Sequence, residues 1–152
     1  MAVSAPPDYN ALLDSARAVD KPLLLYFTGV ASVNSRKMES PVLKHPSCAQ
    51  LIQLGFVFVP IYVDDRTPLP EADRPLNERT GLPHTTIGSV GSELQISLTQ
   101  TGSQPFFFIV DGDGYEYGSS YYEPEREAFK RFLAMASLEY LERHDPAFQP
   151  SE

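Results

Sequence analysis

The chain has 152 residues, 42% of them hydrophobic, and a formal net charge of −8 at pH 7. This length suits one domain with a substantial core, so we expect a single domain over residues 1–152. Acidic character on this scale repels the phosphate backbone and argues against nucleic acid as a partner. The longest apolar runs are far shorter than the ~20 residues that cross a bilayer, so we expect no direct membrane insertion.

Composition also excludes sites built on several cysteines. Cys48 is the only cysteine, which rules out an internal disulfide and a cysteine-rich metal cage. The three histidines are scattered, so we expect no bound metal and no other cofactor. The first ten residues lack a basic segment followed by an apolar one, so they predict no signal peptide.

The first half of the chain predicts a helix followed by a strand and a second helix. Asp8 can cap a helix that ends near residue 20. Leu23–Thr28 is an unbroken apolar run, as in a strand covered on both faces. Helical spacing begins at Ser32 and must be interrupted at Pro41, because proline lacks the amide donor of a helix interior.

A parallel strand pair follows from the next segment. Pro46 can begin a further helix, with Gly55 as its C-terminal stop. Residues 56–63 read FVFVPIYV and predict a second buried strand. A strand, a helix and a strand at this spacing imply a right-handed parallel crossover. Residues 64–83 are rich in Asp, Arg and Pro, and predict a long surface excursion in which Asp64 is solvated or caps a strand end.

The second half predicts a helix, a hairpin and a last helix. Apolar residues recur at helical spacing over about residues 89–101, and Gly102 would end that helix. Phe106–Val110 is a third strand, and the turn DGDG returns the chain through residues 115–118. Pro124 can begin the last helix, which has the clearest apolar face in the chain.

This order of elements predicts an α/β fold. Its central mixed sheet would combine a parallel β-α-β unit with an antiparallel hairpin, flanked by helices. Asp111 and Asp113 in the hairpin turn lack the later bidentate acid of a calcium loop, so a tight turn explains them. Cys48 falls on the inner side of a short helix, where a free cysteine packs as a small hydrophobe. A resolving thiol is the alternative.

The sequence SVNS at residues 32–35 follows closely on the first strand. Ser32 would stand at the N-terminus of the next helix, where free backbone amides and the helix dipole favour negative charge. A cysteine there becomes a stabilised thiolate, and a second one in place of Ser35 can resolve a mixed disulfide. Serine does neither, and no histidine is placed as its base, so the plain role of Ser32 is that of an N-cap.

Gln104 and Pro105 immediately precede the third strand, on the side that would face the Ser32 loop. We favour a cis peptide bond here, since the cis form of an X-Pro bond is only about 0.5–1 kcal/mol less stable than the trans form. Such a bond would turn a carbonyl toward an extended peptide substrate. A trans proline at the start of an edge strand is the alternative.

Several segments together resemble the C-terminal thioredoxin-like domain of the thiol:disulfide interchange protein DsbD. They are KPLLLYFTG, VNSRKME, VDDRTPLPE and SQPFF, in the same order. The family motif reads Cys-Val-Asn-Cys where this chain has Ser-Val-Asn-Ser. The resemblance implies a thioredoxin-like fold in which Ser32 replaces the attacking thiolate, Ser35 replaces the resolving thiol and Pro105 is the cis-proline. The further substrate-binding residues would be Gly29, Val33, Asn34 and Gln104.

For function, the resemblance implies a periplasmic domain that takes electrons from a membrane-embedded partner and passes them to thioredoxin-like proteins. Because both cysteines are serine, we expect this form to be redox-inactive. The alternative is a naturally redox-silent module that binds extended peptides along the groove between Ser32 and Pro105. A third reading, a structural or assembly role in the cytoplasm, rests only on the missing signal peptide.

Overall fold

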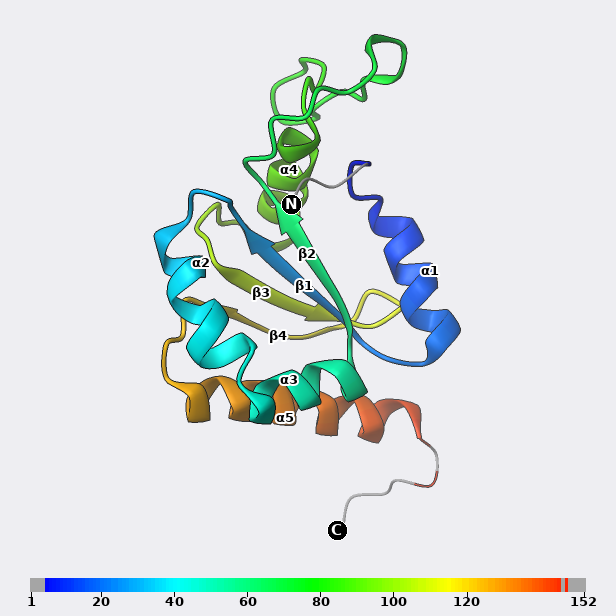
Figure 1. Cartoon of the computed structure of the whole chain (residues 1–152). Helices are drawn as coiled ribbons and strands as arrows, with labels where there is room; N and C mark the ends of the chain where they lie inside the picture. Colours follow the sequence, from blue (N-terminus) through cyan, green and yellow to red (C-terminus); the bar gives the residue numbers. More distant parts are fainter. Residues whose placement is uncertain (1–4, 146, 148–152) are drawn as a thin grey trace.

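Four strands form one sheet between two layers of helices in the computed structural model, which describes residues 5–145 and 147 (Figure 1). The helices and strands are α1 (Tyr9–Val19), β1 (Leu23–Thr28), α2 (Val33–Met38), α3 (Pro46–Gly55), β2 (Val57–Tyr62), α4 (Ile87–Thr99), β3 (Phe106–Val110), β4 (Glu116–Tyr121) and α5 (Arg126–His144). A π-helical turn, Glu39–Leu43, follows α2, and a 3-10 turn, Glu71–Asp73, lies between β2 and α4.

The sheet has the strand order β2-β1-β3-β4. β1 runs parallel to β2 and antiparallel to β3, and β3 runs antiparallel to β4. Every residue of β1 is buried, as its unbroken apolar sequence predicts. The expected α/β fold with a mixed sheet flanked by helices is therefore confirmed.

Each face of the sheet has its own core. Leu24 and Tyr26 pack on the face covered by α3, α5 and the segment after β1, whereas Leu23, Leu25 and Phe27 pack with α1 and α4. This division follows from the alternation of side chains along a strand. Figure 1 shows the two helical layers on opposite sides of the sheet.

α4 begins and ends earlier than the sequence predicts. Thr86 is its N-cap and accepts a hydrogen bond from the amide of Ser89 at 3.2 Å. At the other end Gln100 takes a left-handed backbone conformation, with φ 57°, and closes the helix before Gly102 is reached. Capping by the threonine outweighs the apolar periodicity that suggested a start near residue 89.

Two prolines act differently at helix ends. Pro41 lies within the π-helical turn, which accommodates the interruption that the sequence predicts. Pro124, by contrast, was expected to begin the last helix, and this is wrong. α5 begins at Arg126 because Glu125 is still extended.

Two strand boundaries also differ from the prediction. β2 starts at Val57, because the amide of Phe56 still closes α3 by donating to the carbonyl of Ile52 at 3.2 Å. β4 continues to Tyr121 instead of ending at Gly118, and it pairs with the whole of β3. The predicted hairpin is present, but its second strand is longer and shifted along the chain.

Asp111 is the polar centre of the turn between β3 and β4. Its side chain is fully buried and accepts hydrogen bonds from the Tyr117 hydroxyl at 2.8 Å and from the amides of Asp113 and Tyr115 at 2.9 and 3.0 Å. Burial alone would raise the pKa of this carboxyl. The bonds it accepts and the nearby His144 ring instead hold that pKa below its ordinary value.

We expect Asp111→Ala to lower the free energy of unfolding by about 3 kcal/mol at neutral pH, because buried donors lose a charged acceptor. Since the folded-state pKa is depressed, this stabilisation is present above the ordinary carboxyl pKa of about 4 and is lost as the pH falls through the folded value. Urea unfolding at neutral and acidic pH measures the effect, with exposed Asp113→Ala as the control. A loss that stays equally large in acid would contradict this account.

Candidate functional site

Ser32 and Ser35 lie at the N-terminus of α2, after the loop that follows β1. Ser32 is the N-cap, and its Oγ accepts a hydrogen bond from the Ser35 amide at 3.2 Å. The Ser35 hydroxyl donates to the same oxygen at 2.9 Å. Ser35 is fully buried, whereas Ser32 is partly exposed. The N-cap role expected for Ser32 is confirmed, and the two hydroxyls form a bonded pair.

In the part of the chain that the structure describes, this hydroxyl pair has no base within hydrogen-bond reach. Among the described residues, neither serine oxygen bonds to a histidine or a carboxylate. A serine hydroxyl needs such a base to act as a nucleophile, so the arrangement does not support acyl transfer. Sulfur atoms replacing oxygens that lie 2.9 Å apart could form a disulfide after small side-chain rotations. The geometry therefore suits a dithiol, while the residues present are not thiols.

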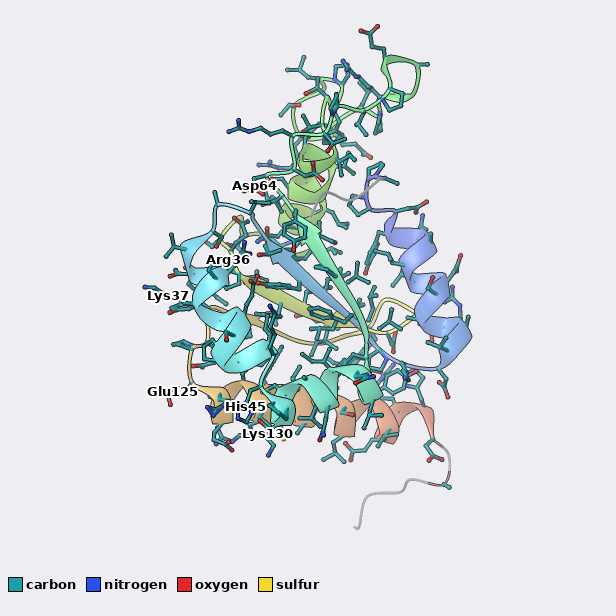
Figure 2. All side chains as sticks on the ribbon, viewed as in Figure 1. Arg36, Lys37, His45, Asp64, Glu125 and Lys130 are labelled. Atoms are coloured by element: carbon teal, nitrogen blue, oxygen red, sulfur yellow. The ribbon has the colours of Figure 1, made fainter. Side chains whose placement is uncertain are left out.

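Two charged side chains hold the loop between β1 and α2, and both are labelled in Figure 2. The Asp64 carboxylate accepts hydrogen bonds from the amides of Val30 and Ala31 at 2.9 and 3.1 Å. Arg36 donates to the carbonyl of Val30 at 3.1 Å. A Cβ on Gly29 would lie 3.1 Å from an Asp64 carboxylate oxygen, so the glycine permits this close approach.

Sequence reasoning missed the role of Asp64, which it placed in a solvated loop or at a strand end. The side chain is exposed, yet it bonds to the loop that carries Ser32. The signal in the sequence was the position of Asp64 just after the end of β2. Because β1 and β2 are parallel, their carboxyl ends meet at one edge of the sheet, and an acid there reaches the amides of the neighbouring loop.

We expect Asp64→Ala to lower the free energy of unfolding by about 1 kcal/mol, since an exposed charged acceptor contributes less than a buried one. The more specific readout is hydrogen exchange, which should become faster at the amides of Val30 and Ala31. Asp64→Asn keeps one acceptor oxygen and should give an intermediate effect. Unchanged exchange at both amides in Asp64→Ala would show that the carboxylate does not hold the loop.

Pro105 lies at the same end of the sheet as the Ser32 loop. Phe27 of β1 pairs with Phe106 of β3, so the preceding proline lies beside the end of β1. Pro105 is buried and its peptide bond with Gln104 is cis. The strand register thus brings the Gln104–Pro105 segment to the edge where the Ser32 loop begins.

A buried glutamine of α4 holds this segment in place. Gln95 is fully buried, donates to the carbonyl of Ser103 at 2.8 Å and accepts from the side-chain amide of Gln104, also at 2.8 Å. The side-chain amide of Gln104 also donates to the carbonyl of Gly102 at 2.6 Å. No sequence motif marks Gln95, because a glutamine on a helix has no characteristic spacing to a distant loop.

Apolar side chains border the serine pair on the outside. Val30 and Val33 are 59% and 65% exposed, and they flank Ser32 in the chain. Both valines therefore place apolar surface beside the N-terminus of α2. Of the other predicted site residues, Gly29 lies in the same loop and Asn34 in the first turn of α2. Their role in binding stays a prediction.

Cys48 takes no part in this site. Its side chain is fully buried in the core between the sheet and α3 and α5, with its Sγ 3.9 Å from the carbonyl of Arg126. Burial raises the pKa of this thiol, so little thiolate is present at neutral pH. The interpretation of Cys48 as a small buried hydrophobe agrees with its place in the structure.

His84 forms a second polar cluster that the sequence did not reveal. The ring is almost completely buried, and its Nδ1 contacts the Ser89 hydroxyl while its Nε2 lies 2.6 Å from Glu93. The Glu93 carboxylate also accepts from the amide of Glu78 at 2.8 Å. The cluster fastens the excursion after β2 to α4, so this segment is only partly the solvated loop that was expected.

One histidine lies close to two carboxylates of the hairpin turn. Ligand atoms of Asp111, Asp113 and His144 lie within 4.8 Å of one another. The Asp111 oxygens already accept several hydrogen bonds, and Asp113 lies 3.4 Å from the Arg17 guanidinium. These contacts explain the cluster without an ion, and we assign no metal to it.

The solved structures that this chain resembles share one fold. A DsbH oxidoreductase aligns with a TM-score of 0.64 and 18% identity, over 90% of this chain and 86% of the other. A thioredoxin from Thermus thermophilus aligns with a TM-score of 0.64 and 20% identity over the whole of both chains. The reduced DsbD C-terminal domain of Neisseria meningitidis gives 0.55 and 15%, over 84% and 93%. At these identities the likeness establishes the fold alone.

Comparison at the sequence level says more about the family than the structural likeness does. No curated protein matches the chain. No described helix is long and apolar enough to span a bilayer. A family model described as thioredoxin-like matches residues 4–87, which is more than half of the sequence and includes the Ser32 loop and β2. The chain belongs to the thioredoxin-like family.

Proposed function

We propose that this chain is a DsbD-type thiol:disulfide interchange domain in a serine form, which keeps the surface that holds a partner polypeptide and transfers no electrons. The observation that carries the proposal is the hydroxyl pair at the start of α2. Ser32 and Ser35 are bonded to each other at 2.9 Å, where a dithiol would act, and neither bonds to a base within residues 5–145. Oxygen in place of sulfur forms no disulfide, so binding is the activity that remains.

The partner in this proposal is an extended polypeptide, either a peptide or a segment of a thioredoxin-like protein. Support comes from the backbone of Gln104, whose amide and carbonyl have no hydrogen bond among the described residues. Free backbone groups at the end of a strand can pair with an extended chain. The exposed valines, Val30 and Val33, offer apolar contact beside them.

The proposal extends to the place of the domain in a larger system. The DsbD-like segments favour the periplasm, with a membrane-embedded domain as the partner that would donate electrons to a cysteine form. The solved structures of similar fold include two Dsb-type proteins, which supports the proposal of a DsbD-type domain. A module that is redox-silent by nature would use the same surface, so both readings predict thiol-independent binding.

Binding can be tested with the carboxymethylated B chain of insulin, an extended polypeptide without free thiols. Fluorescence anisotropy would measure its affinity for the parent chain and for Val30→Ser/Val33→Ser. We expect the double variant to bind about tenfold more weakly, because two apolar contacts are lost. The matched control is Leu54→Ser/Leu138→Ser, which removes exposed apolar side chains from α3 and α5. Equal weakening in both double variants would contradict the proposed surface.

A further inference from the structure

The outer edge of β2 presents unpaired backbone groups. In the described part of the sheet β2 has a single neighbour, β1 (Figure 1). The amides of Val57 and Val63 donate toward β1, each at 2.9 Å. Because successive residues of a strand alternate in direction, the backbone groups of Phe58, Pro60 and Tyr62 face away from β1.

Four of these outward groups are open to a partner. The amides of Phe58 and Tyr62 have no acceptor among the described residues, and the carbonyls of Phe58 and Pro60 receive no donor there. The carbonyl of Tyr62 accepts from the amide of Asp65 at 3.3 Å and is less available. Phe58 is 37% exposed, and the edge strand VFVPIY carries no charge. Such an edge is a template for strand addition.

Two hollows flank this edge on opposite faces of the sheet. The one on the α3 side has a volume of about 490 Å³ and is lined by Tyr26, Leu43, Ile52, Phe58 and Tyr62, among others. The one on the α1 side has a volume of about 230 Å³ and includes Leu12, Val59 and Ile61 in its lining. An added strand would point alternate side chains into the two hollows, since side chains alternate across a sheet.

From these features we propose that the β2 edge binds an extended segment of another polypeptide by strand addition. Main-chain bonds to Phe58, Pro60 and Tyr62 would hold the segment, and the two hollows would select its side chains. The larger hollow, with its aromatic lining, suits an aromatic or long aliphatic residue. The smaller one suits valine or alanine. The expected partner sequence therefore alternates large and small apolar residues.

A second copy of this chain is a poorer occupant. Two-fold antiparallel pairing of β2 with itself about Pro60 would set two prolines opposite each other, with no amide donor between them. The same pairing would ask the carbonyl of Tyr62, already an acceptor, to serve Phe58 of the other copy. A foreign strand with an amide opposite Pro60 satisfies all the open groups. Pro60 thus acts against self-association while leaving strand addition possible.

The test uses a panel of capped seven-residue peptides that alternate large residues (Phe, Leu or Tyr) with valine, and that end in lysine for solubility. NMR of the intact chain would follow the amides of Phe58 and Tyr62. We expect saturable shifts at these amides and exchange slowed by roughly tenfold or more. N-methylation of the peptide amides that face β2 should abolish binding, while methylation of the other alternate set should leave it intact.

Three variants sharpen the result. Phe58→Pro removes an outward amide that β1 does not use and should abolish binding, whereas Phe58→Ala keeps that amide and should only weaken it. Pro60→Val supplies a donor and should tighten binding several-fold. The proposal is overturned if no peptide protects the amides of Phe58 and Tyr62, or if shifts appear only around Ser32 and Pro105. Slowed exchange that depends on protein concentration without peptide would instead identify a second copy as the occupant.

Discussion

Ser32→Cys combined with Ser35→Cys is expected to give a chain that catalyses the reduction of insulin by dithiothreitol, whereas we expect no catalysis by the serine chain. The N-cap position at the start of α2 favours a thiolate at residue 32. A thiol pKa lowered from about 8.5 to about 7 raises the thiolate fraction at pH 7 by roughly fifteenfold. We expect the initial rate of insulin reduction to be at least roughly tenfold above the uncatalysed background.

Single variants separate the two roles. Ser32→Cys alone should form a stable mixed disulfide with a substrate and show no turnover, because no second thiol resolves it. Ser35→Cys alone should react slowly, because residue 35 is fully buried. A folded double variant that forms no disulfide between residues 32 and 35 would count against the dithiol geometry. One that forms the disulfide without catalysing turnover would count against the DsbD-type assignment.

Phe107→Ala is expected to lower the free energy of unfolding by about 3–5 kcal/mol. Phe107 is completely buried in β3, stacks on Tyr26 at a centroid distance of 4.8 Å and meets Phe129 edge-on at 4.7 Å. Removing its ring leaves a cavity between the sheet and α5 that the surrounding elements cannot fill. Since whole domains have only about 5–15 kcal/mol of stability, the variant should be close to unfolding at room temperature.

Phe58→Ala is the matched control for this prediction. Phe58 also stacks on Tyr26, at 5.8 Å, but it is 37% exposed on the edge strand. Its loss should cost roughly 1 kcal/mol, because much of the ring is already in water. Urea denaturation monitored by circular dichroism would measure both variants. Similar losses for Phe58→Ala and Phe107→Ala would contradict the placement of the core between the sheet and α5.

The sequence predicted the layers of the fold well, because its strongest signals are local. The apolar run Leu23–Thr28 became a fully buried central strand, and the segments before and after it became α1 and the parallel crossover. Helix ends were less predictable. α4 depends on a cap at Thr86, and α5 starts after Pro124 instead of at it. Periodicity indicates that a helix exists, while local hydrogen bonds decide where it begins.

The candidate site was predictable where its residues stand next to a predicted strand, as the serines do after the first strand and Gln104 and Pro105 do before the third. Ser32 and Ser35 were found through their spacing and their position after a strand. The groups that hold them come from elsewhere in the chain. Asp64, which follows β2 in the chain, bonds to the loop that carries Ser32. Gln95 of α4 bonds to the side chain of Gln104. A carboxylate or an amide that bonds to a distant backbone leaves no periodic pattern in the sequence.

The most direct test of the central claim is an NMR titration of the unmodified serine chain with the carboxymethylated insulin B chain. We predict saturable shifts at the amides of Val30, Val33 and Gln104, unchanged by dithiothreitol, because binding at this surface requires no thiol. Saturation without any shift at these amides would contradict the claim that the serine pair marks a polypeptide-binding surface. The same conclusion would follow if binding appeared only after cysteines replaced Ser32 and Ser35.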